Sequence, residues 1–173
     1  LLSRRQRQMC IRDRNIIAEA DKLALREMIN RGIFEGRATG PETVGETKIL
    51  WPNKPHKNRT EGHWETIVSL TYGLAQSREY TRLYVNRGIR NEVPGAKRNR
   101  RPDIIAVRAD GTIDIFEVPS NSDSTKKLRI RMDEVQGYFG DRRGISEIVD
   151  IKAGEGGSYD PFVFFDGESR HRL

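Results

Sequence analysis

Two apolar runs that flank a short turn, at residues 103–108 and 112–118, constrain the fold more than any other feature of this chain. Both runs are rich in isoleucine and valine, and Gly111 lies in the turn, which together predict an antiparallel β-hairpin. A carboxylate lies at the end of each run away from the turn, Asp103 on the first and Glu117 on the second. Because side chains alternate between the two faces of a strand, the length of the turn decides whether these acids share a face.

Two registers of this hairpin are possible. A two-residue turn at 110–111 would place Asp103 and Glu117 on opposite faces and set Val107 against Asp114. A three-residue turn at 109–111 would pair position 103 with 117, and one face would then be apolar throughout with both acids at its rim. We favour this second register because its core face is uninterrupted and because Gly111 suits the left-handed residue of the bulge that it requires. The opposite, more polar face is then expected to carry three residues near the turn, Arg108, Thr112 and Asp114.

The favoured register makes the acid pair a candidate metal site. Directly opposed side chains have Cβ atoms about 4.5–5.5 Å apart, and like charges at that separation are destabilising. A divalent cation offsets this repulsion, and carboxylate oxygens suit Mg²⁺, with Mn²⁺ as the alternative. The simpler reading is that Asp103 and Glu117 end the hairpin and point separately into water.

Helical and strand patterns surround the hairpin. Apolar residues at helical spacing predict helices over residues 15–31, 61–77 and 122–139, the last capped by Ser122 or Asp123. In the second helix one face carries Trp64, Ile67, Val68, Thr71, Leu74 and Ala75. Short apolar runs predict further strands at 82–86, 145–151 and 162–165, whereas glycines and prolines in 35–60 indicate a linker or an irregular lead-in. The expected fold is an α/β sandwich around a mixed sheet.

Length and composition fit one globular domain without a membrane span. The chain has 173 residues, of which 35% are hydrophobic and 32% charged, and no apolar run is long enough for a transmembrane helix. Its only cysteine is Cys10, which excludes disulfides elsewhere and suits a reducing compartment such as the cytoplasm. The expected organisation is a tail over 1–14, an N-terminal helix and linker over 15–59, and the main domain over 60–173.

The net charge of +6 is concentrated in the tail. Residues 1–14 hold five arginines and one aspartate, a net charge of +4, so the other residues carry only +2. Residues 3–14 resemble translated sequencing-adapter read-through, and the alternative is a natural basic arm. The first residue is leucine rather than methionine, which suggests a fragment or an uncertain gene start. The total charge is therefore a poor argument for nucleic-acid binding.

The order of elements and the acidic motif resemble the PD-(D/E)XK nuclease superfamily. Pro102-Asp103, then Glu117 one hairpin later, lie inside helix-strand-strand-strand-helix-strand, over roughly residues 60–151. The resemblance implies a restriction-endonuclease-like core in which Asp103 and Glu117 hold Mg²⁺. It also implies an acid on the first helix of that core, where Glu65 is the aligned residue and Glu61 the fallback; both are equally readable as solvated helix residues.

The chain departs from this pattern at one position. The family places a lysine two residues after the second acid, where this chain has Pro119. The segment Glu-Val-Pro-Ser, residues 117–120, nevertheless resembles nuclease domains at the C-termini of bacterial polymorphic toxins. We expect the missing cation on the next helix, where Lys127 is preferred over Lys126, unless both are ordinary surface lysines. Ser120 and Gln136 are weaker polar candidates.

Basic residues flank the acids on both sides in the sequence. One cluster precedes Asp103 and the other follows Glu117: Lys97, Arg98, Arg100 and Arg101, then Lys126, Lys127, Arg129 and Arg131. If both lie beside the acids they would hold phosphates there; otherwise they lie on unrelated surfaces.

The sequence therefore predicts a metal-dependent nuclease, with DNA preferred over RNA as substrate. An effector domain of a bacterial toxin is expected, with a cognate immunity protein as partner. The alternatives are a housekeeping or mobile-element nuclease and an inactive domain that only binds nucleic acid. Signatures of zinc deaminases, phosphate-loop proteins, serine hydrolases and dinucleotide-binding folds are absent. His56, His63 and His171 are too scattered in the sequence to predict a site.

Overall fold

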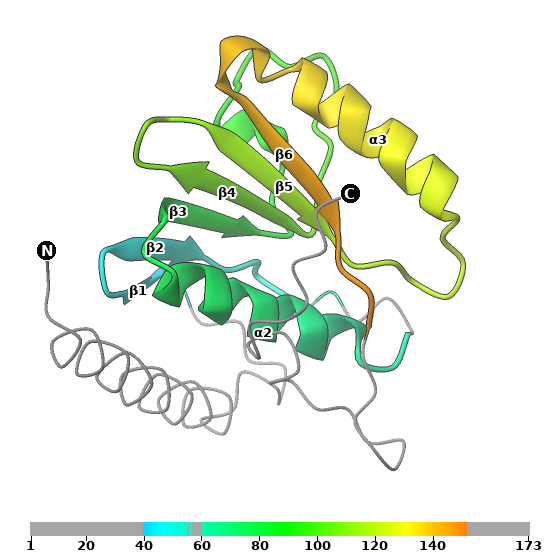
Figure 1. Cartoon of the computed structure of the whole chain (residues 1–173), viewed down its shortest axis with the longest axis horizontal. Helices are drawn as coiled ribbons and strands as arrows, with labels where there is room; N and C mark the ends of the chain where they lie inside the picture. Colours follow the sequence, from blue (N-terminus) through cyan, green and yellow to red (C-terminus); the bar gives the residue numbers. More distant parts are fainter. Residues whose placement is uncertain (1–39, 55, 57–59, 152–173) are drawn as a thin grey trace, which may run out of the picture.

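The computed structural model describes residues 40–54, 56 and 60–151 of the chain. In this part a six-stranded mixed sheet lies between two α-helices, α2 (His63–Gln76) on one face and α3 (Thr125–Gly137) on the other (Figure 1). The expectation of a mixed α/β fold is therefore confirmed. The helix predicted over 15–31, the strand predicted over 162–165 and the basic tail lie outside the described residues.

The strands follow each other across the sheet in chain order. They are β1 (Glu42–Val44), β2 (Thr47–Leu50), β3 (Tyr80–Val85), β4 (Ile104–Arg108), β5 (Ile113–Glu117) and β6 (Arg143–Ile148). The pairs β2–β3 and β5–β6 are parallel, and the other neighbours are antiparallel. Short 3₁₀ helices lie at η2 (Ile89–Asn91) and η3 (Gly140–Arg142). The strand predicted over 82–86 begins two residues earlier, and the one predicted over 145–151 is β6.

Part of the segment predicted to be irregular forms a hairpin. Strands β1 and β2 turn at Gly45, which has a φ of 58°, and β2 pairs with β3. Ile49 is fully buried, and the hydroxyl of Thr47 donates to the carbonyl oxygen of Tyr80. These strands have only three and four residues, too few for an alternating pattern to be recognised. The pairing of β2 with β3, a contact between segments distant in the sequence, stabilises this hairpin.

Helix α2 (His63–Gln76) buries the face that the sequence predicted. Trp64, Ile67, Val68 and Ala75 are almost completely buried. The ring of Trp51, which follows β2, lies 6.2 Å from that of Trp64 and 5.5 Å from that of Tyr72, measured between centroids, and fixes the helix against the sheet.

The central hairpin adopts the favoured three-residue register. Ile105 pairs with Ile115 and Val107 with Ile113, and the amide of Arg108 donates to the carbonyl oxygen of Thr112 over 2.8 Å. Gly111 has a φ of 88°, the left-handed conformation expected for the bulge. Extending this register by one residue places Asp103 opposite Glu117.

Each face of the hairpin contributes to a separate core. One face packs beneath α3 (Thr125–Gly137) and consists of Ile105, Val107, Ile113 and Ile115. The alternate residues, Phe116 among them, belong to the core on the face of the sheet that α2 covers. The second face is therefore less polar than expected. Asp114 on that face is buried, and it accepts hydrogen bonds from the Tyr80 hydroxyl, the Arg108 guanidinium and the Ile145 amide.

The predicted cap of α3 is wrong. The N-cap residue is Ser124, whose side chain makes no capping hydrogen bond. The carboxylate of Asp123 instead accepts hydrogen bonds from the amide and hydroxyl of Ser120, over 2.9 and 2.7 Å. Asp123 thus stabilises the turn between β5 and α3 rather than the helix itself. Among the described residues, no helix is both long and apolar enough to cross a membrane.

Candidate functional site: an acid pair at the sheet edge

Four strand ends meet where the two acids lie. Asp103 directly precedes β4, and its carbonyl oxygen accepts from the amide of Asn86, just after β3, over 2.7 Å. Glu117 ends β5, and its carbonyl oxygen accepts from the amide of Val149, just after β6, over 2.9 Å. The backbone on both sides of the acid pair is therefore held by the sheet. The acids are 4% and 3% exposed, which no pair of side chains pointing separately into water would be.

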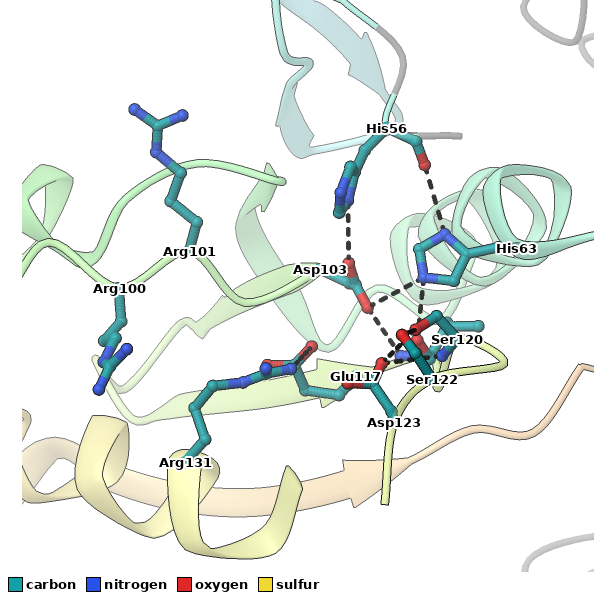
Figure 2. Close-up of a pocket in the computed structure, with 11 residues that line it drawn as sticks. His56, His63, Arg100, Arg101, Asp103, Glu117, Ser120, Ser122, Asp123 and Arg131 are labelled. Atoms are coloured by element: carbon teal, nitrogen blue, oxygen red, sulfur yellow. Dashed lines mark hydrogen bonds and ion pairs between the residues drawn. The ribbon is translucent and has the colours of Figure 1, made fainter. Parts of the chain in front are cut away.

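A pocket of about 370 Å³ opens onto the acid pair (Figure 2). Its walls come from the loop before α2, the first residue of α2, the loop before β4, the end of β5 with the turn after it, and α3. The lining residues are His56, His63, Arg100, Arg101, Asp103, Glu117, Val118, Ser120, Ser122, Asp123 and Arg131. Such a concave, polar site suits a charged ligand.

The two carboxylates differ in their surroundings. Oδ2 of Asp103 accepts a hydrogen bond from the amide of Val118 over 2.8 Å. Burial raises the pKa of Glu117 to about 8, helped by the negative charge of Asp103 and a hydrogen bond to it, and opposed by Arg131. A guanidinium nitrogen of Arg131 lies 3.4 Å from a carboxylate oxygen of Glu117. Arg131 contacts only Glu117 of the two acids, and a bound cation would be stabilised between Asp103 and Glu117.

The structure places two histidines beside Asp103, which the sequence did not predict. His63, the first residue of α2, donates from Nε2 to the carbonyl oxygen of Val118 over 2.9 Å, and the same nitrogen lies 3.8 Å from Oδ2 of Asp103. His56 has its Nδ1 3.7 Å from the other oxygen of Asp103, Oδ1. The two rings meet edge to face (Figure 2), with centroids 5.5 Å apart. Both histidines are distant from Asp103 in the sequence. They come close to it only because α2 packs beside the hairpin.

Glu65 does not line the pocket. Successive residues of an α-helix are about 100° apart, so Glu65 lies about 200° around α2 from His63, which points toward Asp103. Glu61 is exposed in the turn before the helix and is also not a lining residue. The histidine therefore occupies the side of α2 that faces the acid pair.

The cation that lines the pocket from α3 is an arginine. Lys126 and Lys127 are exposed and contribute nothing to the pocket wall, whereas Arg131, one turn after Lys127, contacts Glu117. Ser120 lines the pocket but is hydrogen-bonded to Asp123. Gln136 lies elsewhere in the fold, donating to the carbonyl oxygens of Ile113 and Ile145.

The predicted basic residues divide into two groups. Arg100 and Arg101 line the pocket, while Lys97, Arg98, Lys126 and Arg129 are exposed outside it. Glu134 of α3 binds Arg98 over 3.3 Å and Arg100 over 2.9 Å. These ion pairs attach the loop before β4 to α3, so the two basic clusters are neighbours. Part of their charge is neutralised by Glu134.

The acid pair fits a hydrated divalent cation. Within the described ranges, no three His, Cys, Asp or Glu side chains are already arranged as a metal-binding group. Mg²⁺ commonly takes only one or two carboxylates and keeps several waters. Asp103 and Glu117 would be those ligands, and a pocket of this size has room for the waters.

The raised pKa of Glu117 predicts how stability depends on pH in metal-free buffer. The folded state holds this proton more tightly than the unfolded state, so unfolding free energy should fall as pH rises from 4.5 to about 8. The slope from this group approaches about 1.4 kcal/mol per pH unit. Glu117→Gln should flatten it, as measured by urea denaturation in EDTA between pH 5 and 8. Equal slopes for both proteins would show that Glu117 titrates normally.

Comparison with known protein families, with curated proteins and with solved structures found no match.

Proposed function

We propose that this chain is a metal-dependent endonuclease that hydrolyses phosphodiester bonds, with DNA as its substrate. One observation carries the proposal: two buried carboxylates, Asp103 and Glu117, are opposed at the end of a hairpin and open onto a pocket whose walls carry arginines. Acids in this arrangement hold a divalent cation, and arginines bind the phosphates beside it.

The order of elements supports a restriction-endonuclease-like core. From α2 onward the chain runs helix, three antiparallel strands, helix, and a strand parallel to the third. This is the αβββαβ order implied by the family resemblance, and the acids lie on the hairpin formed by its second and third strands. The proposal therefore includes this fold, to which β1 and β2 add one edge of the sheet.

Different pocket residues would have different roles in the proposed reaction. A bound metal ion would activate water and stabilise charge on the phosphate. Asp103 and Glu117 would hold it, while Arg100 and Arg101 orient the phosphodiester through charged hydrogen bonds. Arg131, a guanidinium nitrogen of which is 3.4 Å from a carboxylate oxygen of Glu117, would stabilise the extra negative charge of the transition state.

The biological setting proposed is a bacterial toxin effector domain with a cognate immunity protein. It rests on the resemblance of residues 117–120 to the ends of such nuclease domains. A second function is favoured by one specific observation: Pro119 replaces the family's lysine, and the pocket has no lysine in its lining as described. In that case the domain binds nucleic acid without cutting it.

Cleavage assays on plasmid DNA and on structured RNA test the proposal. Purified protein is incubated with each polymer in Mg²⁺ or in EDTA, and binding is measured in parallel by fluorescence anisotropy. Cleavage of DNA that requires the metal supports the endonuclease. Binding without cleavage in Mg²⁺ or Mn²⁺ supports the inactive binder. If the protein neither binds nor cleaves either polymer, both functions are excluded.

Arg131 is expected to act as the catalytic cation. Arg131→Ala should lower kcat about 10²-fold or more with little change in KM, because the lost charge acts on the transition state. Lys127→Ala is the matched control on the same helix, and it should leave kcat within about threefold because Lys127 is outside the pocket. The reverse ranking of the two variants would assign the role to Lys127.

A further inference from the structure

His56 lines the pocket with a ring nitrogen that makes no hydrogen bond among the described residues. Its Nδ1 is buried and has no hydrogen-bond partner among the described residues, although the side chain as a whole is 42% exposed. The nearest acidic oxygen is Oδ1 of Asp103, 3.7 Å away, which is too far for a hydrogen bond. The ring lies at the wall of the pocket that holds the acid pair (Figure 2).

The two carboxylate oxygens of Asp103 have different neighbours. Oδ2 is occupied by the amide of Val118, whose own carbonyl oxygen is bound by His63. Oδ1 faces His56, whose Nδ1 lies 3.7 Å away. A cation at Asp103 would therefore bind through Oδ1, on the side where the free nitrogen of His56 lies.

His63 cannot provide a ligand, but it positions the residue that can. Its side chain is 1% exposed, and both ring nitrogens contact backbone carbonyl oxygens: Nε2 that of Val118, and Nδ1 that of His56 at 3.3 Å. The second contact and the edge-to-face stacking of the rings hold the backbone of His56 against α2.

We propose that His56 is a nitrogen ligand of the metal centre, bound through Nδ1, so that the site prefers Mn²⁺ or Co²⁺ to Mg²⁺. This inference rests on the proposed metal site of Asp103 and Glu117. Neighbouring ligands at about 2.1 Å from an octahedral ion lie about 3.0 Å apart. The 3.7 Å gap would close by about 0.7 Å on binding, which a half-exposed ring allows. Imidazole nitrogen is a poor ligand for Mg²⁺, which prefers oxygen, whereas divalent transition metals accept it with an affinity that rises from Mn²⁺ to Co²⁺.

Metal binding without nucleic acid tests this inference independently of cleavage. The variant His56→Phe keeps the ring that stacks on His63 and removes both nitrogens. Titration calorimetry should show Mn²⁺ affinity lowered about tenfold or more and Mg²⁺ affinity within about threefold of wild type. The visible spectrum of bound Co²⁺ should change between the two proteins because its ligand set loses a nitrogen. His56→Asn provides a second variant if the phenylalanine disturbs folding.

The controls separate this inference from the proposed function. Lys54→Ala, two residues earlier and exposed, should leave both affinities unchanged. Asp103→Asn should lower the affinity for both Mn²⁺ and Mg²⁺. Equal Mn²⁺ affinity in wild type and His56→Phe would overturn the inference while leaving the nuclease proposal intact. Loss of Mn²⁺ affinity in a protein that cuts neither polymer would support the ligand and remove the nuclease.

Discussion

Asp103→Asn and Glu117→Gln should each reduce the proposed Mg²⁺-dependent DNA cleavage at least about 10³-fold, because each removes one of the two charges that would hold the proposed metal ion. Both substitutions preserve side-chain volume, and the hydrogen bond from the Val118 amide to Asp103 remains possible in the asparagine variant. The loss should appear in kcat, measured under saturating substrate, with DNA affinity in EDTA unchanged. Mg²⁺ affinity, measured by calorimetry, should fall in parallel.

Glu65→Gln provides the matched control for these variants. It removes an acid from α2, on the side of the helix away from His63, and should leave cleavage within about threefold of wild type. A loss as large as that of Asp103→Asn would place Glu65 in the metal centre, as the family resemblance implies. Full activity of Asp103→Asn and Glu117→Gln would falsify the two-acid centre.

The hairpin and its acids could be predicted because local rules determine them. Alternation of side chains left two registers, and only one of them gave an uninterrupted apolar face beside Gly111. The same reasoning placed Asp103 opposite Glu117. Helical periodicity likewise identified the buried face of α2, because a helix of 14 residues contains enough turns to show it.

The rest of the pocket depends on contacts between distant segments. His56 and His63 meet Asp103 only because α2 packs beside the strand ends, and no spacing in the sequence encodes that. Arg131 was one of several basic residues on α3, and it lies on the same helix face as Lys127 but one turn further along, where it contacts Glu117. The position of α3 along the pocket therefore decides between the two, and the sequence does not show it.

Asp114 marks where residue type misled the prediction of the hairpin's second face. A carboxylate in an apolar strand was expected to face solvent. Asp114 is buried instead, because three hydrogen-bond donors contact its carboxylate. Gly144 contributes as well, since a Cβ there would collide with Oδ1 of Asp114 and lie 2.6 Å from the carbonyl oxygen of Ile113. Burial and hydrogen bonding to this carboxylate raise the pKa of Tyr80, so its hydroxyl remains a donor.

Asp114→Ala should lower the free energy of unfolding by about 3–5 kcal/mol, because it leaves Arg108, the Tyr80 hydroxyl and the Ile145 amide without their shared acceptor. A domain of this size has a free energy of unfolding of only about 5–15 kcal/mol, so the variant would lose a large part of its stability. Urea denaturation measures the change, and Asp114→Asn should lose less because its amide oxygen still accepts.

Asp133→Ala is the matched control, since this aspartate is 70% exposed and its nearest cation, Arg143, is 3.6 Å away. A surface pair of this kind contributes less than about 1 kcal/mol. The ranking distinguishes a buried network from simple charge removal. If Asp114→Ala cost no more than Asp133→Ala, the hydrogen bonds around Asp114 would not stabilise the fold. The turn end of the hairpin would then contribute little, and apolar packing of the hairpin against α2 and α3 would alone hold the acid pair in register.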